Sequence, residues 1–433
     1  MKTYREYLLP SLIASIFMST YVIIDGIIIG YNLNDIGLAA INIAWPINAL
    51  LQSLGLALGI SSGIYLTRLE ASGKSDIKKR LMFGLLTILS LVGLIVGLIL
   101  FFLRNHILVL FGAKDETLEC AKRYITIILY GAIFEFLGLA IIPLNKNIGH
   151  VKLAMIASIS STIVNFILDY LLIVVFPLGL EGAAIASVIG EFSCFIIGVI
   201  PYIKSSKGFL ITKVALKEVF LGGIAPFILN YSYAVLIIIT NALALKYGSE
   251  GAVAAYTVLS YLLYVINALS SGSADAIQPL FSYNIEIKNH KKNKALLIKT
   301  IIISFILVMS FNIIFLILKN QISILYGLTT YAKEIYDIAF VYYFIGFIFI
   351  SISKVLCSYF YSINKKILAN IFVLIEPLLL TPILYLIFIN IIGITGLWVS
   401  FMVVQIILAI ALVISILFHW RSKNGRIFDS QQA

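Results

Sequence analysis

Long apolar runs dominate this sequence and decide what it can fold into. They recur along all 433 residues and are separated by short breaks rich in polar residues, Gly or Asn. A helix needs about 20 apolar residues to cross a bilayer, whereas the strands of a membrane β-barrel are shorter and alternate in polarity. We therefore expect an all-α integral membrane protein. Its twelve transmembrane helices are predicted at residues 8–31, 36–66, 81–103, 121–143, 152–176, 181–203, 215–246, 251–281, 296–318, 333–361, 365–391 and 394–419.

Composition supports this interpretation. The chain is 61% hydrophobic and 12% charged, whereas soluble domains are about 45–50% apolar and about 25% charged. The first apolar run begins at Leu8 and shows no small-residue cleavage site, which predicts a retained helix and not a signal peptide. The three cysteines have no motif spacing, so we expect neither a disulfide framework nor a metal site built on them.

The basic residues predict the orientation in the membrane. When the loops are assigned alternately to two sides, 23 Lys and Arg residues fall on the side of the N-terminus and seven on the other. Basic residues collect on the cytoplasmic side, so both termini are expected in the cytoplasm. The net charge of +11 then reflects topology and contact with anionic lipid, not nucleic-acid binding. Nothing in the sequence indicates oligomerisation, and we expect a monomer.

The two halves of the chain resemble each other at one offset. IGLAAINIAWPI (36–47) matches EGAVAAYTVLSY (250–261), and GLEGAAIAS (179–187) matches GITGLWVS (393–400), at separations near 215 residues. An offset of six helices keeps the orientation, so the repeats are parallel. We expect two six-helix lobes, residues 1–208 and 209–433, with a substrate site between them near the membrane midplane. Duplication in a membrane protein that transports nothing is the alternative.

A few polar residues interrupt the apolar runs, and two of them share a helix face. In STIVNFILDYLLIVVF (161–176), Asn165 and Asp169 are four residues apart, and Asp25 lies in the first helix. A charged side chain at the bilayer centre costs about 2.5–3.5 kcal/mol on insertion scales, so such residues mark candidate functional sites. The repeat offset carries Asp25 to Thr240, which indicates a specialised site in the first lobe only.

Two carboxylates in a medium of low dielectric cannot both stay ionised cheaply. A shared proton is one solution, since burial and a neighbouring like charge both favour the protonated form. The other is Na⁺ held by oxygens of Asp25, Asn165, Asp169 and Ser187, because hard cations prefer oxygen ligands. The alternative is a structural role, in which Asp169 holds helices together through hydrogen bonds.

Several residues are candidates for lining a substrate cavity. Glu135 lies mid-helix and could attract a cation, or it could have a structural role. Trp45, Tyr231, Tyr256 and Tyr261 lie on helices 2, 7 and 8, and aromatic faces bind flat organic cations. For each aromatic residue, packing inside the protein is the alternative.

The sequence resembles the multidrug and toxic compound extrusion (MATE) transporters over nearly its full length, in particular their MepA-like bacterial branch. The segments that carry the resemblance are YVIIDGIIIGYNLNDIGLAAINIAWPI (21–47), GHVKLAMIASISSTIVNFILDYLLIVVFPLGLEGAAIAS (149–187) and IQPLFSYN (277–284). Three features depart from the family pattern. The loop after helix 4 reads NKNIGHVKLAM, the segment after SYN reads IEIKNHKK, and helix 7 has no acidic cluster.

The resemblance implies a V-shaped pair of six-helix lobes that exports organic cations across the cytoplasmic membrane in exchange for H⁺ or Na⁺. It also implies coupling residues at Asp25, Asn165, Asp169 and Ser187, and a helix-bending proline at Pro10. No cofactor beyond the coupling ion is expected.

Two other functions are weighed against this one. A lipid-linked oligosaccharide flippase of the same superfamily would need basic residues for its pyrophosphate cargo, and only Lys354 lies well inside a span. An integral-membrane enzyme would need a constellation such as a helical HExxH, which the sequence does not contain. We therefore expect a transporter and not an enzyme.

Overall fold

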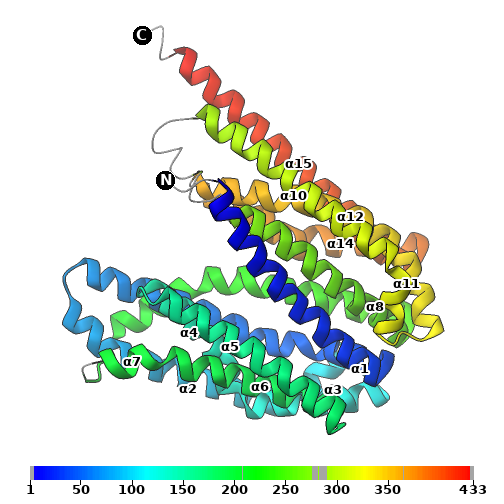
Figure 1. The fold of residues 1–433 in the computed structure, drawn as a ribbon, viewed down its shortest axis with the longest axis horizontal. Coiled ribbons are helices and arrows are strands. Elements are labelled where there is room, and N and C mark those ends of the chain that lie inside the picture. Colours follow the sequence, from blue (N-terminus) through cyan, green and yellow to red (C-terminus); the bar gives the residue numbers. More distant parts are fainter. Residues whose placement is uncertain (1–3, 207, 276–280, 282–289, 364, 430–433) are drawn as a thin grey trace. The chain divides into compact units, whose positions relative to one another are not determined.

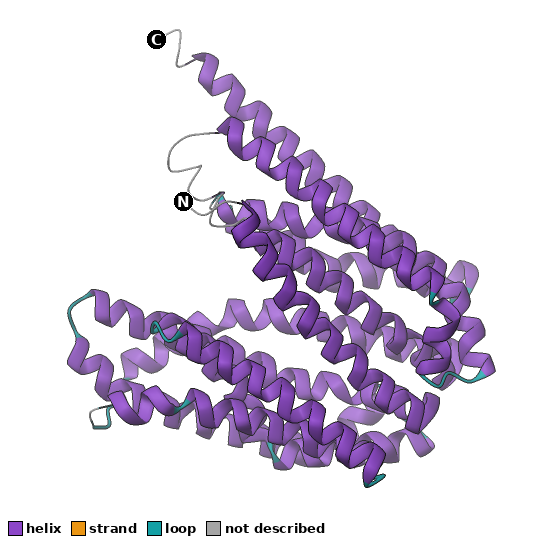
Figure 2. Cartoon of the chain, viewed as in Figure 1, coloured by secondary structure: helices purple, strands orange, loops and turns teal. Residues whose placement is uncertain are grey.

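The computed structural model describes residues 4–206, 208–275, 281, 290–363 and 365–429, and within these ranges the chain is helical with no strand (Figures 1 and 2). The elements are α1 (Tyr4–Ala71), α2 (Ser75–Leu110), α3 (Asp115–Tyr130), α4 (Ala132–Asn147), α5 (Val151–Asp169), the π-helical turn η1 (Tyr170–Val175), α6 (Gly179–Gly198), α7 (Ile200–Ser205), α8 (Lys213–Asp275), α10 (His290–Ile317), α11 (Lys319–Leu325), α12 (Thr330–Ser362), α13 (Lys366–Ile375), the π-helical turn η2 (Glu376–Leu380), α14 (Thr381–Ile392) and α15 (Thr395–Asp429).

The expected all-helical architecture is confirmed. Among the described residues, nine helices are long and apolar enough to cross a membrane, and α3 and α4, bent by 64° at their junction, form a tenth candidate. Two of the long helices are each broken once, α1 at Asn34 and α8 at Gly248 and Ser249. The breaks fall between predicted spans 8–31 and 36–66, and between 215–246 and 251–281. Each of the twelve predicted spans therefore has a helical counterpart.

The backbone repeats with the same offset as the sequence. Asn34 (φ 53°) and Ser249 (φ 60°) are 215 residues apart, and both have positive φ at the break of a long helix. Helices α3 and α12 begin 215 residues apart, as do α5 and α13. Positive-φ glycines follow the same pattern, with Gly112 matched by Gly327. The repeat thus extends from local sequence to the places where helices begin and break.

Contacts divide the chain into two compact units. One, called here the N-terminal unit, is Asp25–Ala254, and the other, the C-terminal unit, is Ala255–Ala433 with Met1–Ile24. The first half of α8 belongs to the N-terminal unit because it packs on α1, where Ser61 Oγ donates to Glu218 O (3.2 Å) and Arg68 pairs with Glu218 (3.5 Å). The predicted lobe boundary at residues 208 and 209 stays a prediction.

Small residues bring α1 against α4 in the N-terminal unit. Gly55, Gly59 and Gly63 recur every four residues and form one stripe on α1. A Cβ at Gly55 would lie 2.2 Å from Phe136 O, and one at Gly59 would lie 2.3 Å from Ala140 O. Glycine is the residue that lets two membrane helices approach this closely. This crossing holds α4, which carries Glu135, against the second half of α1.

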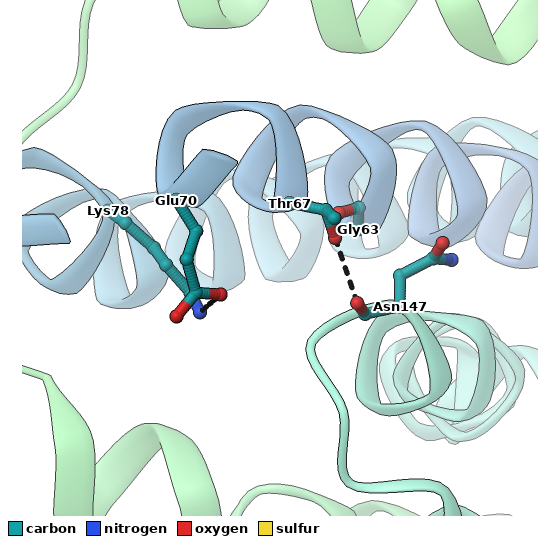
Figure 3. Close-up of polar contacts among 5 residues, drawn as sticks. All are labelled: Gly63, Thr67, Glu70, Lys78 and Asn147. Carbon is teal, nitrogen blue, oxygen red and sulfur yellow. Dashed lines mark hydrogen bonds and ion pairs between the residues drawn. The ribbon is translucent and has the colours of Figure 1, made fainter. Parts of the chain in front are cut away.

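Polar contacts fix one end of the same helix pair (Figure 3). Thr67 Oγ1 lies 2.8 Å from Asn147 O and 2.9 Å from Gly63 O. Across the turn between α1 and α2, Lys78 Nζ pairs with Glu70 Oε2 at 2.5 Å. The end of α4 is therefore tied to α1, and α1 is tied to α2, at the same end of the unit.

The C-terminal unit packs around α12 and α15, which lie side by side (Figure 1). Tyr343 of α12 stacks on Phe401 of α15 with ring centroids 4.1 Å apart. Trp398 of α15 is fully buried next to Tyr343. Aromatic stacking thus makes up much of the core of this unit.

Candidate functional site

Helix α5 has one buried polar face. Ser161, Asn165 and Asp169 recur every four residues, which places them on one side of the helix. Asn165 is 5% exposed and Asp169 1% exposed, whereas Phe166 and Ile167 on the opposite side are 40% and 50% exposed. The helix therefore turns its polar residues into the protein and its apolar residues outward, as a lipid-facing helix should.

The polar face of α5 packs against α6. A Cβ at Gly190 of α6 would lie 3.0 Å from Asn165 Cβ, and one at Gly182 would lie 3.0 Å from Leu172 Cβ. The two contacts run in opposite chain directions, so the helices are antiparallel, and this register puts Asp169 opposite residues 185 and 186. Asn165 and Asp169 thus face α6, and Ser187 is the residue after this position on that helix.

The backbone changes type directly after Asp169. Helix α5 ends at this residue, and the π-helical turn η1 begins at Tyr170. A π-helical turn inside a helix is uncommon and occurs frequently at functional sites. The placement of Asp169 at this junction is consistent with a functional role.

Two predicted residues of the site lie outside what can be described in detail. Asp25 and Pro10 belong to α1, but their side chains are outside the described part of the chain. Their roles in coupling and in bending stay predictions.

Among the predicted cavity residues, Trp45 and Tyr231 lie near each other in the N-terminal unit. The Tyr231 hydroxyl is 3.4 Å from Pro46 O, the carbonyl next to Trp45. The Tyr231 ring stacks on Phe227 with centroids 5.5 Å apart. Both Trp45 and Tyr231 are half-buried.

The other two aromatic residues belong to the C-terminal unit. Tyr256 is 2% exposed and stacks on Trp398 at 6.4 Å, and Tyr261 stacks on Tyr326 at 5.6 Å. These contacts account for both rings as packing residues, and their role in substrate binding stays a prediction.

Glu135 lies in the interior of the N-terminal unit. It is 0% exposed, and Gln52 Nε2 donates a hydrogen bond to its Oε2 at 3.0 Å. Its neighbours are α1 on one side and α6 on the other. Its role in attracting a substrate stays a prediction. Gln52 was not singled out from the sequence, although a glutamine inside an apolar run is a usable signal.

A pair of asparagines was also not anticipated. Asn42 Nδ2 donates to Asn241 Oδ1 at 3.1 Å, and Asn241 Nδ2 donates to Asn42 O at 2.9 Å. Both residues are buried. The signal in the sequence is two asparagines in each of two apolar spans (Asn42 and Asn48, Asn230 and Asn241), but nothing in it shows which of them pair.

Known proteins share this sequence pattern. The MatE family model matches residues 10–171. The multidrug export protein MepA of Staphylococcus saprophyticus is 25% identical over 429 residues, which cover 95% of this chain and 92% of the relative. MepA of Staphylococcus aureus (strain MRSA252) is 27% identical over 312 residues, 70% of this chain and 68% of the relative. The chain is thus similar to MATE family transporters along nearly its whole length. The relatives are transporters and not enzymes, and together with the apolar helices they support a multi-pass membrane transporter.

Solved structures of MATE transporters share the fold. An inward-facing multidrug resistance MATE family transporter matches with a TM-score of 0.81 and 18% identity, over 94% of this chain and 97% of that one, which shows the fold. The MATE multidrug transporter DinF-BH, solved as a complex, matches with a TM-score of 0.71 and 25% identity over 96% of this chain and 94% of that one.

Proposed function

We propose that this transporter exports small organic cations across the cytoplasmic membrane in exchange for H⁺ or Na⁺, coupled at Asp25, Asn165 and Asp169 with Ser187. The observation that carries the proposal is the almost complete burial of Asp169 and Asn165 on the face of α5 that meets α6. The names of the relatives, multidrug export proteins, support the direction and the class of cargo.

Burial of Asp169 gives the ion a physical role. An ionised carboxylate in a medium of low dielectric is unfavourable unless a proton or a cation neutralises it. The ion stabilises whichever state of the transporter buries the carboxylate more deeply. A ligand shifts such an equilibrium only through its different affinities for the two states. Binding and release of the ion at Asp169 would thus favour alternate states of the transport cycle.

The distribution of basic residues supports an orientation with both termini in the cytoplasm. In a bacterial cell membrane, the gradient of the coupling ion, H⁺ or Na⁺, then drives that ion into the cell while the organic cation leaves. The transporter is proposed to work as a monomer.

Transport in liposomes tests the proposal. The purified full chain is reconstituted, and movement of a fluorescent organic cation is followed under a pH gradient or a Na⁺ gradient imposed separately. We expect one gradient to drive transport in the wild type, and Asp169→Asn to abolish that drive. Glu119→Gln is the matched control, since it makes the same chemical change at a carboxylate that is 60% exposed on α3.

The outcomes separate the alternatives. Full gradient-driven transport by Asp169→Asn would assign Asp169 to helix packing and contradict its coupling role. If the wild type moves no cation under either gradient, export of organic cations is wrong, and translocation of a lipid-linked pyrophosphate should be assayed next.

A further inference from the structure

Two glutamates from different helices meet in the core of the N-terminal unit. Glu135 lies on α4 and is 0% exposed. Glu191 lies on α6 and reaches over to α4, where its Oε2 is 2.1 Å from the position that a Cβ on Gly138 would occupy. Gly138 is three residues after Glu135 and so lies on nearly the same face of α4. The two carboxylates therefore share one region between the helices, and only a glycine leaves room for the second.

Donors from two more helices hold one oxygen of each carboxylate. Gln52 Nε2 of α1 donates to Glu135 Oε2 at 3.0 Å, and Ser161 Oγ of α5 donates to Glu191 Oε1 at 3.4 Å. The remaining oxygens, Glu135 Oε1 and Glu191 Oε2, are buried and make no hydrogen bond in the described part of the chain. Asn48, 5% exposed and one turn before Gln52, lies within reach of Glu135, and its Oδ1 is likewise without a donor.

In the described helices around the two acids, no basic side chain lies in the stretches that flank them. The helical stretches that surround them contain no Lys, Arg or His within residues 36–67, 81–103, 124–145, 153–203 and 219–245. The other titratable groups of these helices near the pair are the Cys194 thiol, which donates to Gly138 O at 3.4 Å, and Asp169 on α5. Neither group supplies a positive charge. Two buried carboxylates without a cation cannot both ionise, so at least one proton must stay with them.

A polar stripe connects this pair with the predicted coupling site. Ser161, which donates to Glu191, is followed on the same face of α5 by Asn165 and then by Asp169. At a rise of 1.5 Å per residue the eight residues from Ser161 to Asp169 span about 12 Å. The two glutamates therefore lie at the Ser161 end of the stripe, and the predicted coupling site lies at the Asp169 end.

We propose that Glu135 and Glu191 form a second proton-binding site, distinct from the site at Asp169 and located between α4 and α6. The pair holds one proton between its unpartnered oxygens and releases it when the pH is raised. Its existence does not depend on the transport reaction proposed above.

Infrared difference spectroscopy of the full chain in lipid tests this proposal. Spectra in mildly acidic and mildly alkaline buffer are compared, and the carbonyl stretch of protonated carboxylic acids is followed. We expect Glu135→Gln and Glu191→Gln each to remove or shift one pH-dependent band of the wild type. Glu181→Gln, the same change in the first turn of α6, should leave that band in place. Asp169→Asn should also leave it in place, which separates this site from the coupling site.

A second measurement covers the case in which Glu135→Gln fails to fold. Thermal unfolding of wild type and Glu191→Gln is compared at the two pH values. The wild type should lose more stability in alkaline buffer, because its pair is then forced to carry two like charges, whereas Glu191→Gln carries at most one. Identical pH dependence of unfolding in the two proteins, or an unchanged carbonyl band in Glu191→Gln, would overturn the proposal.

Discussion

Asn42 and Asn241 hold α1 and α8 together through two hydrogen bonds, one between their side chains at 3.1 Å and one from Asn241 Nδ2 to Asn42 O at 2.9 Å. The residues are 199 positions apart in sequence. Side-chain hydrogen bonds between membrane helices contribute about 0.6 kcal/mol on average and up to about 1.7 kcal/mol. Both residues are buried and joined by two hydrogen bonds, which places the pair toward the upper end of that range.

Removing one member of the pair should therefore destabilise the N-terminal unit. We expect Asn241→Leu to lower the free energy of unfolding by about 1–2 kcal/mol, because it leaves the amide of Asn42 buried without its partner. The double variant with Asn42→Leu should lose less than the sum of the single changes. Thermal unfolding in lipid measures these differences. Asn230→Leu on the same helix is the control, since Asn230 is exposed and bonds only to Pro226 O of its own helix. If the losses in the free energy of unfolding from the two single changes add exactly, the hydrogen bonds between Asn42 and Asn241 do not stabilise the protein.

The contact of Gly59 with Ala140 yields a second prediction. A Cβ at Gly59 would lie 2.3 Å from Ala140 O, so Gly59→Ala must push α4 away from α1. Overpacking of this kind typically costs about 1–3 kcal/mol, and we expect a corresponding fall in thermal stability. Because α4 carries Glu135, the hydrogen bond from Gln52 should weaken as well. Ile64→Leu, a change at a position 40% exposed on α1, should have no such effect. Wild-type stability in Gly59→Ala would disprove the close approach.

The breaks in α1 and α8 lead to a third prediction. Asn34 (φ 53°, ψ −156°) and Ser249 (φ 60°, ψ −170°) occupy a backbone region that is used almost only by glycine. Replacing either residue with Gly should raise the free energy of unfolding by about 1 kcal/mol, since the strain of such a residue is of order 1–3 kcal/mol. Asn32→Gly is the matched control, because Asn32 lies in the helix and Gly, with a lower helix propensity than Asn, should destabilise it by about 0.3 kcal/mol. The same sign of effect at residues 32 and 34 would contradict the assignment of the break.

The hydrogen bond between Gln405 and Glu376 gives a fourth prediction, in the C-terminal unit. Gln405 Nε2 donates to Glu376 Oε1 at 2.6 Å, at the start of the π-helical turn η2. Gln405→Leu should lower the free energy of unfolding by about 1.5–3 kcal/mol if Glu376 is ionised, and by about 1 kcal/mol if it is protonated. Unfolding curves measured across a range of pH distinguish the two cases. Asn390→Leu, which removes a bond internal to α14, serves as the control. If Gln405→Leu and Asn390→Leu lower the free energy of unfolding equally, the hydrogen bond to Glu376 stabilises the protein no more than a bond within one helix.

The sequence by itself determined the helical class, the positions of the spans and the repeat. These follow from local composition: an apolar run long enough to cross a membrane must be helical there, because every backbone polar group needs a partner within the segment. The same reasoning put Asn165 and Asp169 on one face, since a spacing of four residues has a single meaning on a helix. The offset of about 215 residues was visible as sequence similarity and recurs in the positive φ angles of Asn34 and Ser249.

Only the tertiary structure decided which polar residues meet. Nothing in the sequence showed that Glu135 and Glu191, which lie on separate predicted spans, would meet, and Gln52 and Asn42 carried no assigned role. Their partners lie between 30 and 199 residues away in the chain. Which helices approach, and in what register, depends on packing details such as the glycines at 55, 59, 138 and 190, where the absence of a Cβ lets another helix come close. Hydrophobic periodicity shows that a residue faces inward, but the identity of its neighbour is a property of the packed helices.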